Sequence, residues 1–201
     1  KLWNRMGVLN VEKIINASIK KKIKFLSLYT FSTENWKRPK SEINFLLKLL
    51  ENYIDKELTN LKKKGVKIKI IGDIDKFPNS LKKKLKITEL ITKNNNFIQV
   101  NVALNYGSRQ ELINCLKKIQ KKTLKINEKN ISENLYTKGI PDPDILIRTG
   151  NTKRLSNFLL WQLTYSEIFF ERKLWPDFTE RDYTRIINKF KKTNRNFGGL
   201  I

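Results

Sequence analysis

The side chains best suited to chemistry form a polar run that follows an apolar one. Residues 23–31 are mostly apolar and rich in aromatic rings, which predicts a strand buried on both faces of a parallel sheet. The polar run that follows carries hydroxyls, a carboxylate, an amide, an indole and a guanidinium: Ser32, Thr33, Glu34, Asn35, Trp36, Lys37, Arg38 and Pro39. In open α/β sheets ligands bind beyond the carboxyl ends of the strands. The polar run therefore predicts a ligand site.

Two residues of this run strengthen that prediction. An exposed tryptophan ring in a loop is unfavourable, so Trp36 is expected to pack on another group. The planar guanidinium of Arg38 can donate two parallel hydrogen bonds to a phosphate. The alternative is an ordinary strand followed by a polar loop and a helix cap.

A second run, RTGNTKRLS at 148–156, is suited to binding an anion. Arg148 ends a short apolar segment, Gly150 allows a tight turn, and Ser156 is the expected N-cap of a helix. Backbone N–H groups at a helix N-terminus, together with the guanidinium groups of Arg148 and Arg154, would fit a phosphate or a diphosphate. The run matches neither the P-loop pattern nor the dinucleotide-binding glycine pattern.

The composition restricts the chemistry that is available. The chain contains no histidine, and Cys115 is its single cysteine, which excludes Ser–His and Cys–His pairs, His-ligated zinc and internal disulfides. Catalysis must then use carboxylates, amides, hydroxyls, arginines and bound metal. Glu167 lies eleven residues after Ser156, at the start of a predicted strand, and is a candidate metal ligand. The alternative for Glu167 is a surface carboxylate.

The net charge of +23 is compatible with nucleic-acid binding. The lysines are spread in short runs, however, and Asn and Ile are abundant too, as codon bias toward A and T would also produce. We therefore expect no nucleic-acid partner. The arginines are more informative. In a lysine-rich chain, an arginine indicates a position where the planar, two-pronged guanidinium group is needed for binding. No window approaches about 18 consecutive apolar residues, so no membrane span is predicted.

The elements that must position these residues alternate between strand and helix. Strands are predicted at 23–31, 66–73, 97–105, 144–148 and 167–170. Helices are predicted at 8–19, 41–65, 80–92, 112–119, 131–137, 158–162 and 179–190, the last with a capping-box start. This order predicts a single α/β domain with a mainly parallel central sheet flanked by helices. The apolar stripe at 43–61 is either core or the wall of an apolar ligand cavity.

Several long motifs, in this order, resemble the cis-prenyltransferase family, which includes the bacterial isoprenyl transferases. They are FSTENWKRP, NVALNYGSR, RTGNTKRLSNFLLWQLTYSEIFF, LWPDF and the final RNFGG. The match covers nearly the whole chain, residues 1–201. Because the motifs are long and specific in composition, we identify the chain as a member of this family.

The resemblance implies a homodimeric, Mg²⁺-dependent enzyme. It would condense isopentenyl diphosphate, repeatedly and in cis, with an allylic diphosphate such as farnesyl diphosphate to make a long-chain polyprenyl diphosphate. We expect a cytoplasmic protein that associates peripherally and transiently with the membrane through its lipid product. The stripe at 43–61 would then form a wall of an apolar tunnel for the prenyl chain.

The resemblance also implies roles for particular residues. Asn35 would assist proton removal, and Glu167 would bind Mg²⁺. The tail Arg195–Gly199 would close the neighbouring subunit's site. The remaining candidates would bind substrate, those at 148–156 by holding the diphosphate of isopentenyl diphosphate: Ser32, Thr33, Glu34, Trp36, Arg38, Arg148, Arg154, Leu155 and Ser156.

The sequence departs from the family pattern at several points. Family members carry an upstream strand and an Asp-Gly-Asn-x-Arg-Trp loop with the principal catalytic aspartate, and these 201 residues do not contain that motif. Asn4 stands where the family has histidine, and Asn151 and Thr152 stand where it has glycine and glutamate. Two hypotheses follow. Either the complete protein is an active synthase whose amino-terminal strand and catalytic loop lie outside this chain, or the chain is a degenerate or accessory diphosphate-binding subunit. Under both we expect that the 201-residue chain alone does not elongate farnesyl diphosphate.

Overall fold

The computed structural model describes residues 2–195, with side chains from Met6 onward. The chain falls into two compact units. The first, called here the two-stranded unit, comprises Lys1–Lys20 and Asp142–Ile201. The second, the three-stranded unit, comprises Lys21–Pro141. Each unit carries part of the predicted site, so each is described in turn.

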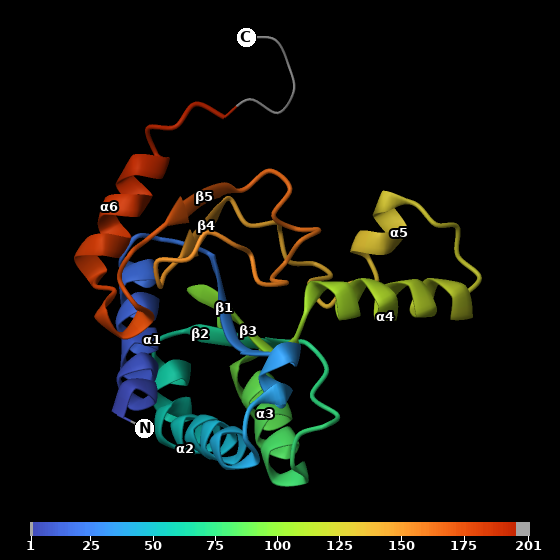
Figure 1. Cartoon of the computed structure of the whole chain (residues 1–201), viewed down its shortest axis with the longest axis horizontal. Helices are drawn as coiled ribbons and strands as arrows, with labels where there is room; N and C mark the ends of the chain where they lie inside the picture. Colours follow the sequence, from blue (N-terminus) through green and yellow to red (C-terminus); the bar gives the residue numbers. More distant parts are fainter. Residues whose placement is uncertain (1, 196–201) are drawn as a thin grey trace. The chain divides into compact units, whose positions relative to one another are not determined.

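The three-stranded unit is built on a parallel sheet with strand order β1-β3-β2 (Figure 1). The strands are β1 (Phe25–Ser32), β2 (Val66–Ile71) and β3 (Ile98–Tyr106). The helices of the unit are η1 (Thr33–Lys37), α2 (Lys40–Lys63), α3 (Asn79–Thr92), α4 (Ser108–Lys121) and α5 (Glu128–Ser132). Each strand lies within two residues of its predicted bounds, because glycine, proline and polar residues delimit the apolar runs.

The burial predicted for the first strand was wrong. Only Phe31 is buried in β1, whereas seven of the nine residues of β3 are buried. The reason is position in the sheet: β3 is the central strand, and β1 pairs with β3 alone among the described residues. The continuous apolar character of 23–31 was therefore a poor guide to burial on both faces.

The core of this unit lies where α2 and α3 pack on the sheet. Its buried side chains come from β1, α2, the segment before α3, α3 and β3: Phe31, Ile43, Leu47, Ile54, Phe77, Leu81, Leu85 and Leu104. Each such side chain contributes about 1.5–3 kcal/mol relative to an exposed one. The apolar stripe predicted at 43–61 is thus part of a packed core, and its role as a tunnel wall stays a prediction.

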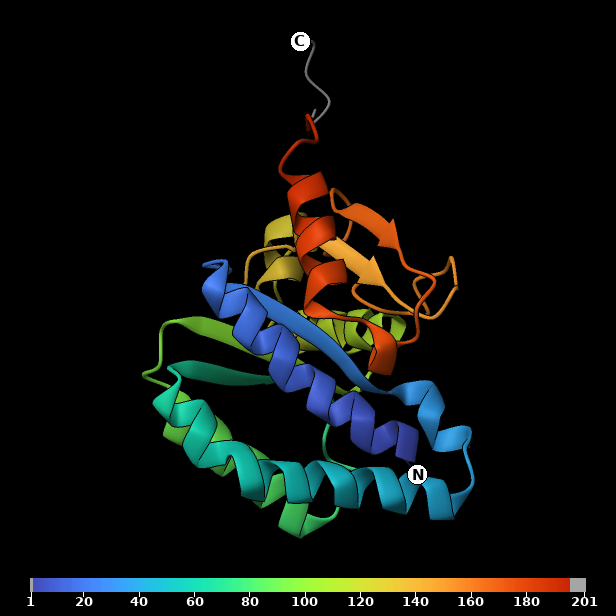
Figure 2. The ribbon, with the colours of Figure 1, turned by 90° about the vertical axis from the view of Figure 1, so that its left-hand side faces the viewer.

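The two-stranded unit pairs β4 (Ile145–Arg148) with β5 (Glu167–Phe170) in parallel. Its helices are α1 (Leu2–Lys20), η2 (Trp175–Asp177) and α6 (Glu180–Phe190). The side-chain amide of Asn10 on α1 donates to the carbonyls of Trp175 (2.6 Å) and Phe178 (2.9 Å). Figure 2 shows α1 and α6 side by side, and the helices are joined by a 2.8 Å hydrogen bond between Ser18 and Tyr183.

The capping box predicted at the start of the last helix is confirmed. Thr179 accepts a hydrogen bond from the backbone N–H of Asp182, and the Asp182 carboxylate accepts one from the N–H of Thr179. The ammonium of Lys173 and the Thr179 hydroxyl also bind this carboxylate and hold its pKa well below the usual range. The cap fixes the start of α6.

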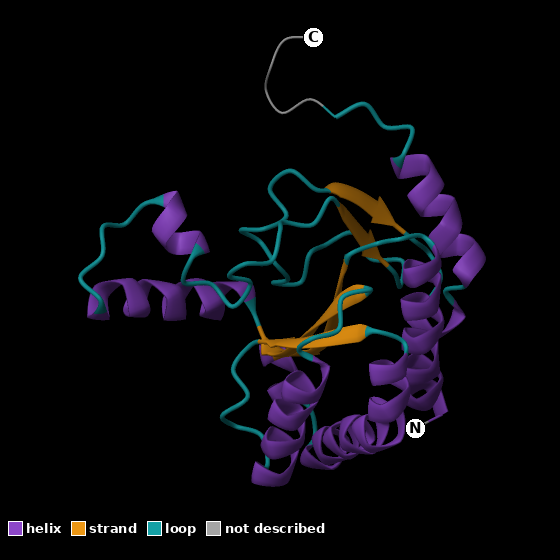
Figure 3. Cartoon of the chain, turned by 180° about the vertical axis from the view of Figure 1, so that it is seen from behind, coloured by secondary structure: helices purple, strands orange, loops and turns teal. Residues whose placement is uncertain are grey.

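The helix predicted to begin at Ser156 is absent. The segment between β4 and β5 consists of turns and loop, as Figure 3 shows. Ser156, Asn157 and Leu159 have φ values of 51°, 64° and 47°, and left-handed residues cannot continue a right-handed helix. Phe158 and Leu159 are buried, but they lie within an irregular loop and not on the face of a helix.

The predicted fold class is confirmed: the structure is α/β, with parallel strands flanked by helices. The assignment of residues 1–201 to one cis-prenyltransferase domain stays a prediction. Among the described residues, no helix is long and apolar enough to cross a membrane.

Candidate functional site

The polar run after β1 folds into the short 3-10 helix η1. The backbone N–H of Ser32 donates to the side-chain oxygen of Asn35 at 2.9 Å, which closes the first turn. The Thr33 hydroxyl donates to the carboxylate of Glu34 at 3.1 Å. Because Ser32 ends β1, Asn35 lies beyond the carboxyl edge of the sheet, where ligands bind in this architecture.

Trp36 is fixed by a residue that the sequence did not single out. Its indole N–H donates to the side-chain oxygen of Asn105 at 2.7 Å, and the amide of Asn105 donates to the carbonyl of Asp73 at 2.5 Å. The Trp36 ring also packs on Phe31 and Phe77, with centroids 5.2 and 5.9 Å apart. Trp36 is therefore held in one orientation by three contacts.

Asn105 offered a signal that sequence reading could have used. It is a polar residue near the end of a mostly apolar strand, and it lies inside the NVALNYGSR motif. In the structure it is 6% exposed and has a φ of 45°, a conformation that asparagine tolerates better than most residues. Its role is to position Trp36.

Arg38 lies at the exposed end of η1. One of its terminal nitrogens donates to the carboxylate of Glu42 at 2.7 Å, and both side chains are partly exposed. An exposed i,i+4 ion pair of this kind contributes only about 0.3–0.5 kcal/mol. The guanidinium can therefore exchange Glu42 for a phosphate at little cost.

The second group of candidates lies in the two-stranded unit, after β4. The side-chain Nε of Arg148, the last residue of that strand, is buried and has no hydrogen-bond partner among the described residues. An unsatisfied nitrogen on a charged group costs more than about 1–3 kcal/mol, so it calls for an acceptor. Arg154 is exposed, and Leu155 and Ser156 are partly buried.

The backbone of this loop does not form the anion site that was predicted. The N–H of Gly150 donates to the carbonyl of Lys173 (2.8 Å), and the N–H of Asn151 donates to the carbonyl of Glu171 (3.1 Å). Since no helix begins at Ser156 and these two N–H groups are occupied, the helix-terminus prediction was wrong. The tight turn at Gly150 is confirmed, with a φ of 89°. Anion binding here would depend on the arginines.

Glu167 is the first residue of β5 and is partly buried. In the strand register it lies beside Ile145, whereas Arg148 lies beside Phe170. The two candidates are therefore three residues apart along the strands, about 10 Å. No cluster of three or more acidic or cysteine side chains able to hold a metal occurs among the described residues. A lone carboxylate still fits Mg²⁺, which proteins often bind through one or two carboxylates plus substrate phosphates.

Arg195 is the described part of the tail that was expected to close a neighbouring site. Its guanidinium donates to the Asp144 carboxylate at 2.6 Å and to the carbonyl of Tyr165 at 3.0 Å, and it lies 5.5 Å from the Phe190 ring centroid. These partners all belong to its own unit. The rest of the predicted tail, residues 196–199, lies outside the described residues.

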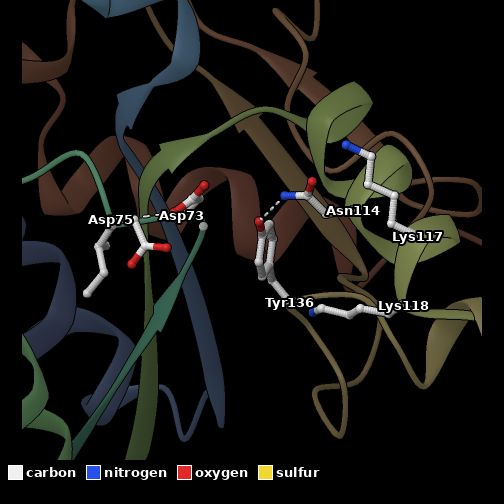
Figure 4. Close-up of a pocket in the computed structure, with 8 residues that line it drawn as sticks. Asp73, Asp75, Asn114, Lys117, Lys118 and Tyr136 are labelled. Atoms are coloured by element: carbon white, nitrogen blue, oxygen red, sulfur yellow. Dashed lines mark hydrogen bonds between the residues drawn. The ribbon is translucent and has the colours of Figure 1, made fainter. Parts of the chain in front are cut away.

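A separate hollow of about 450 Å³ lies in the three-stranded unit, beyond β2. Figure 4 shows Asp73 and Asp75 on one side of Tyr136 and Lys117 and Lys118 on the other. Burial raises the pKa of the Tyr136 hydroxyl, which accepts a hydrogen bond from Asn114 at 2.7 Å. None of the candidate residues lines this hollow, and its charges of both signs offset one another.

The candidates thus form two groups, one in each unit. The three-stranded unit carries Ser32, Thr33, Glu34, Asn35, Trp36 and Arg38, and the two-stranded unit carries Arg148, Arg154, Leu155, Ser156 and Glu167. Asn35 and Trp36 are adjacent in η1, and Arg148 and Glu167 are on paired strands. The guanidinium groups of each unit suit the oxygens of a phosphate or a diphosphate.

Comparison with known proteins gives a consistent result. The profile of a family described as putative undecaprenyl diphosphate synthase matches residues 4–198. The isoprenyl transferase of Prochlorococcus marinus is 45% identical over an alignment of 201 positions. The alignment covers 96% of this chain and 74% of that protein.

Two solved structures extend the comparison. A probable undecaprenyl diphosphate synthase from Campylobacter jejuni has a TM-score of 0.89 and 41% identity, covering 96% of this chain and 92% of that one. Lavandulyl diphosphate synthase from Lavandula x intermedia, solved with dimethylallyl diphosphate, has a TM-score of 0.91 and 29% identity. The match covers 97% of this chain and 87% of that one.

Proposed function

Because this chain belongs to the undecaprenyl diphosphate synthase family, we propose that it elongates prenyl chains in cis by condensing isopentenyl diphosphate with an allylic diphosphate. The observation that carries the proposal in the structure is the buried, unpartnered Nε of Arg148, within a motif shared with the family. A diphosphate oxygen would satisfy that nitrogen. Farnesyl diphosphate is the proposed primer.

The reaction breaks one bond and forms another. The carbon–oxygen bond of the allylic diphosphate breaks and its electron pair leaves with the diphosphate. The double bond of isopentenyl diphosphate then forms a carbon–carbon bond to the allylic carbon, and a proton is lost to restore a double bond. Negative charge grows on the leaving oxygens, so fixed positive groups lower the barrier.

The proposed roles of the residues in the two-stranded unit follow from the resemblance to the family. Arg148 and Arg154, with Leu155 and Ser156, would hold the diphosphate of isopentenyl diphosphate, and Glu167 would bind Mg²⁺. Mg²⁺ supplies neutralisation of charge on the diphosphate oxygens when it is bound.

The η1 residues would position the reacting groups. Asn35 cannot itself take the proton, because an amide is not basic at neutral pH, and its oxygen already accepts from Ser32. Its remaining amide hydrogens would orient the oxygen that receives the proton. The other candidates of this turn would bind substrate: Ser32, Thr33, Glu34, Trp36 and Arg38.

The proposal includes a homodimer and a transient contact with membrane. On the two-stranded unit β5 exposes two large apolar side chains, Ile168 and Phe170, and Tyr165 just before it is also exposed. Exposed apolar side chains on a short strand are typical of a surface that another chain covers. The long hydrocarbon product would bring the enzyme to the lipid in which that product dissolves. The accessory-subunit alternative is not favoured, because the matched relatives are named as transferases over nearly the whole chain.

A labelled-substrate assay tests the proposal. The protein expressed from its complete coding sequence would be incubated with radiolabelled isopentenyl diphosphate, farnesyl diphosphate and Mg²⁺, and butanol-extractable products would be resolved by chain length. We expect long products that disappear with EDTA. Absence of extractable product would contradict the proposed activity.

A further inference from the structure

The amino ends of the strands in the three-stranded unit form one edge, opposite the edge that carries η1. The N–H of Phe97 donates to the carbonyl of Gly65 at 3.1 Å. The N–H of Gln99 donates to the carbonyl of Lys24 at 2.8 Å. These bonds join the three segments that lead into the strands, which we call the basic edge: residues 21–25, 61–67 and 92–97. Figure 2 shows the carboxyl ends of α2 and α3 meeting the starts of β2 and β3 there.

The three segments of the basic edge carry lysines and no acidic residue of their own. Its segments contain eight lysines and no Asp or Glu: Lys21, Lys22, Lys24, Lys62, Lys63, Lys64, Lys67 and Lys93. Across the chain 42 basic residues accompany 19 acidic ones, so eight lysines at the average ratio would come with about four carboxylates. The lysine-rich composition alone therefore does not account for this edge.

Five of these lysines are exposed and form no ion pair with another described residue: Lys22, Lys24, Lys62, Lys63 and Lys93. Other lysines of the same unit do find carboxylates. Lys84 pairs with Glu51 at 3.2 Å and Asp55 at 2.6 Å, and Lys69 pairs with Glu89 at 3.6 Å. The five exposed lysines of the edge are thus available to an external anion.

Large apolar side chains stand among these lysines. Phe97 is 60% exposed and Leu90, near the end of α3, is 61% exposed. The Phe97 ring packs against Gly65, where an added Cβ would lie 2.8 Å from the ring. The absence of a side chain at Gly65 therefore makes room for the ring. Phe25 and Ile91 are also exposed at this edge. Lysines around fixed, exposed apolar groups are the pattern of a surface that enters the headgroup region of a bilayer.

We propose that the basic edge docks the three-stranded unit on an anionic lipid bilayer, with Phe97 and Leu90 at the level of the headgroups. Anionic lipid fits better than nucleic acid for two reasons. The three segments contain no arginine, the residue with the fork geometry for phosphodiester recognition, and the exposed apolar groups would gain nothing from a polyanion in water.

The position of this edge suits the reaction, a point that rests on the proposed function. The core cluster that includes α2 begins at Phe31, near η1, and reaches Ile54. Leu61 and Val66, at the basic edge, are also buried. A hydrocarbon that grows from η1 along the stripe of α2 would extend toward the basic edge. Docking there would place the apolar end of the product at the membrane.

Vesicle flotation of the 201-residue chain tests the docking. Vesicles of phosphatidylglycerol and phosphatidylcholine would be compared with phosphatidylcholine alone, at about 0.1 M and 0.5 M salt. We expect flotation with the anionic vesicles only, and release at the higher salt. A variant with Lys24→Gln, Lys62→Gln, Lys63→Gln and Lys93→Gln should lose at least tenfold in partitioning, since one lysine near an anionic surface contributes about fivefold.

A matched variant controls for net charge. Lys48→Gln, Lys56→Gln, Lys121→Gln and Lys129→Gln remove the same charge from exposed positions away from the basic edge and should retain most of the binding. Leu90→Gln should reduce binding several-fold while its salt dependence stays the same. Thermal melts would confirm that each variant is folded.

Three results would overturn the proposal. They are no flotation of the unaltered chain with anionic vesicles, equal losses in the two four-lysine variants, and tighter binding to a short RNA or DNA duplex than to vesicles in the same buffer. The assay contains no prenyl substrate. A failed docking experiment is therefore distinguishable from a failed synthase assay.

Discussion

The turn after β1 and the turn after β4 carry the two groups of candidate residues, and they are built in opposite ways. In η1 the Asn35 oxygen and the Trp36 indole are already bound, by the Ser32 N–H and by Asn105. After β4 the backbone N–H groups of Gly150 and Asn151 are bound, but the Nε of Arg148 is buried without a partner among the described residues.

The difference indicates which of the two groups of candidate residues needs a ligand to satisfy its hydrogen-bond donors. The η1 turn is preorganised by neutral hydrogen bonds and would provide shape and orientation. The turn after β4 keeps a charged donor unsatisfied, which is unfavourable for stability unless an anion binds. Removing a contact in η1 should therefore cost stability, whereas removing the guanidinium after β4 should cost substrate binding.

The largest expected effect is at Arg148. In the complete protein, Arg148→Met should lower kcat/KM for isopentenyl diphosphate about 100-fold, because charge-assisted hydrogen bonds contribute about 1.5–3 kcal/mol each. The melting temperature without substrate should stay the same or rise, since a buried unsatisfied nitrogen is removed. The two measurements are steady-state kinetics and a thermal melt. A variant that loses stability as well as activity would show that Arg148 is satisfied by the fold, and the contrast between the two turns would disappear.

The next effect is at Asn105. Asn105→Gly should lower the free energy of unfolding by about 1–3 kcal/mol, because the Trp36 indole and the Asp73 carbonyl lose their partner. Glycine is chosen because it adopts the positive φ of this position without strain. Urea denaturation measures the change.

A double-mutant cycle isolates the contact with Trp36. Asn105→Gly should cost distinctly less in a Trp36→Phe background, where there is no indole N–H to satisfy. Equal costs in the two backgrounds would mean that Asn105 stabilises the fold only through Asp73, and that η1 is not preorganised by it.

Arg38 directly follows η1. As for Arg148, its substitution should lower activity and leave stability nearly unchanged. In the complete protein Arg38→Ala should lower turnover at least tenfold, equivalent to about 1.4 kcal/mol of transition-state stabilisation. Its exposed ion pair with Glu42 contributes little, so the free energy of unfolding should change by less than about 0.5 kcal/mol. Glu42→Ala is the matched control, since it removes the same ion pair and leaves the guanidinium. Equal losses of turnover in both variants would refute a direct role for Arg38.

Sequence reading was reliable where local chemistry decides the structure. A glycine lies near the end of the run predicted as a strand at 66–73, and the fold requires Gly72 there: its φ is 124°, and a Cβ would lie 2.0 Å from the carbonyl oxygen of Leu104. Thr179 and Asp182 form the predicted cap for a similar reason, since both partners lie within one turn of helix. The alternation of strands and helices, and hence the fold class, followed from such signals.

Prediction from the sequence failed where contacts between residues far apart in the chain determine the structure. Trp36 and Asn105 are 69 positions apart, and only the pairing of β1 with β3 brings their segments together. The burial of β1 depended on its place in the sheet, which no pattern within 23–31 encodes. The loop after β4 was misread as a helix because apolar spacing cannot reveal left-handed residues, although Asn151 and Asn157 are of a type that adopts them.

That loop supplies the smallest expected effect, at Asn151. The position has a φ of 51°, so the glycine expected there in the family and the asparagine of this chain both suit it. Asn151→Gly should therefore change the free energy of unfolding by less than about 0.5 kcal/mol and leave kcat/KM unaltered. Asn151→Val should destabilise by about 1–2 kcal/mol, because a β-branched residue does not tolerate the left-handed region.

The pair of substitutions separates backbone conformation from chemistry. If Asn151→Gly raised kcat/KM severalfold, the asparagine side chain would be an obstacle to substrate, and the departure from the family pattern would mark a weakened enzyme. If both variants matched the unaltered protein in urea denaturation, the left-handed turn would not be formed in solution. The second result would remove the left-handed turn that closely follows Arg148, and with it the contrast between the two turns.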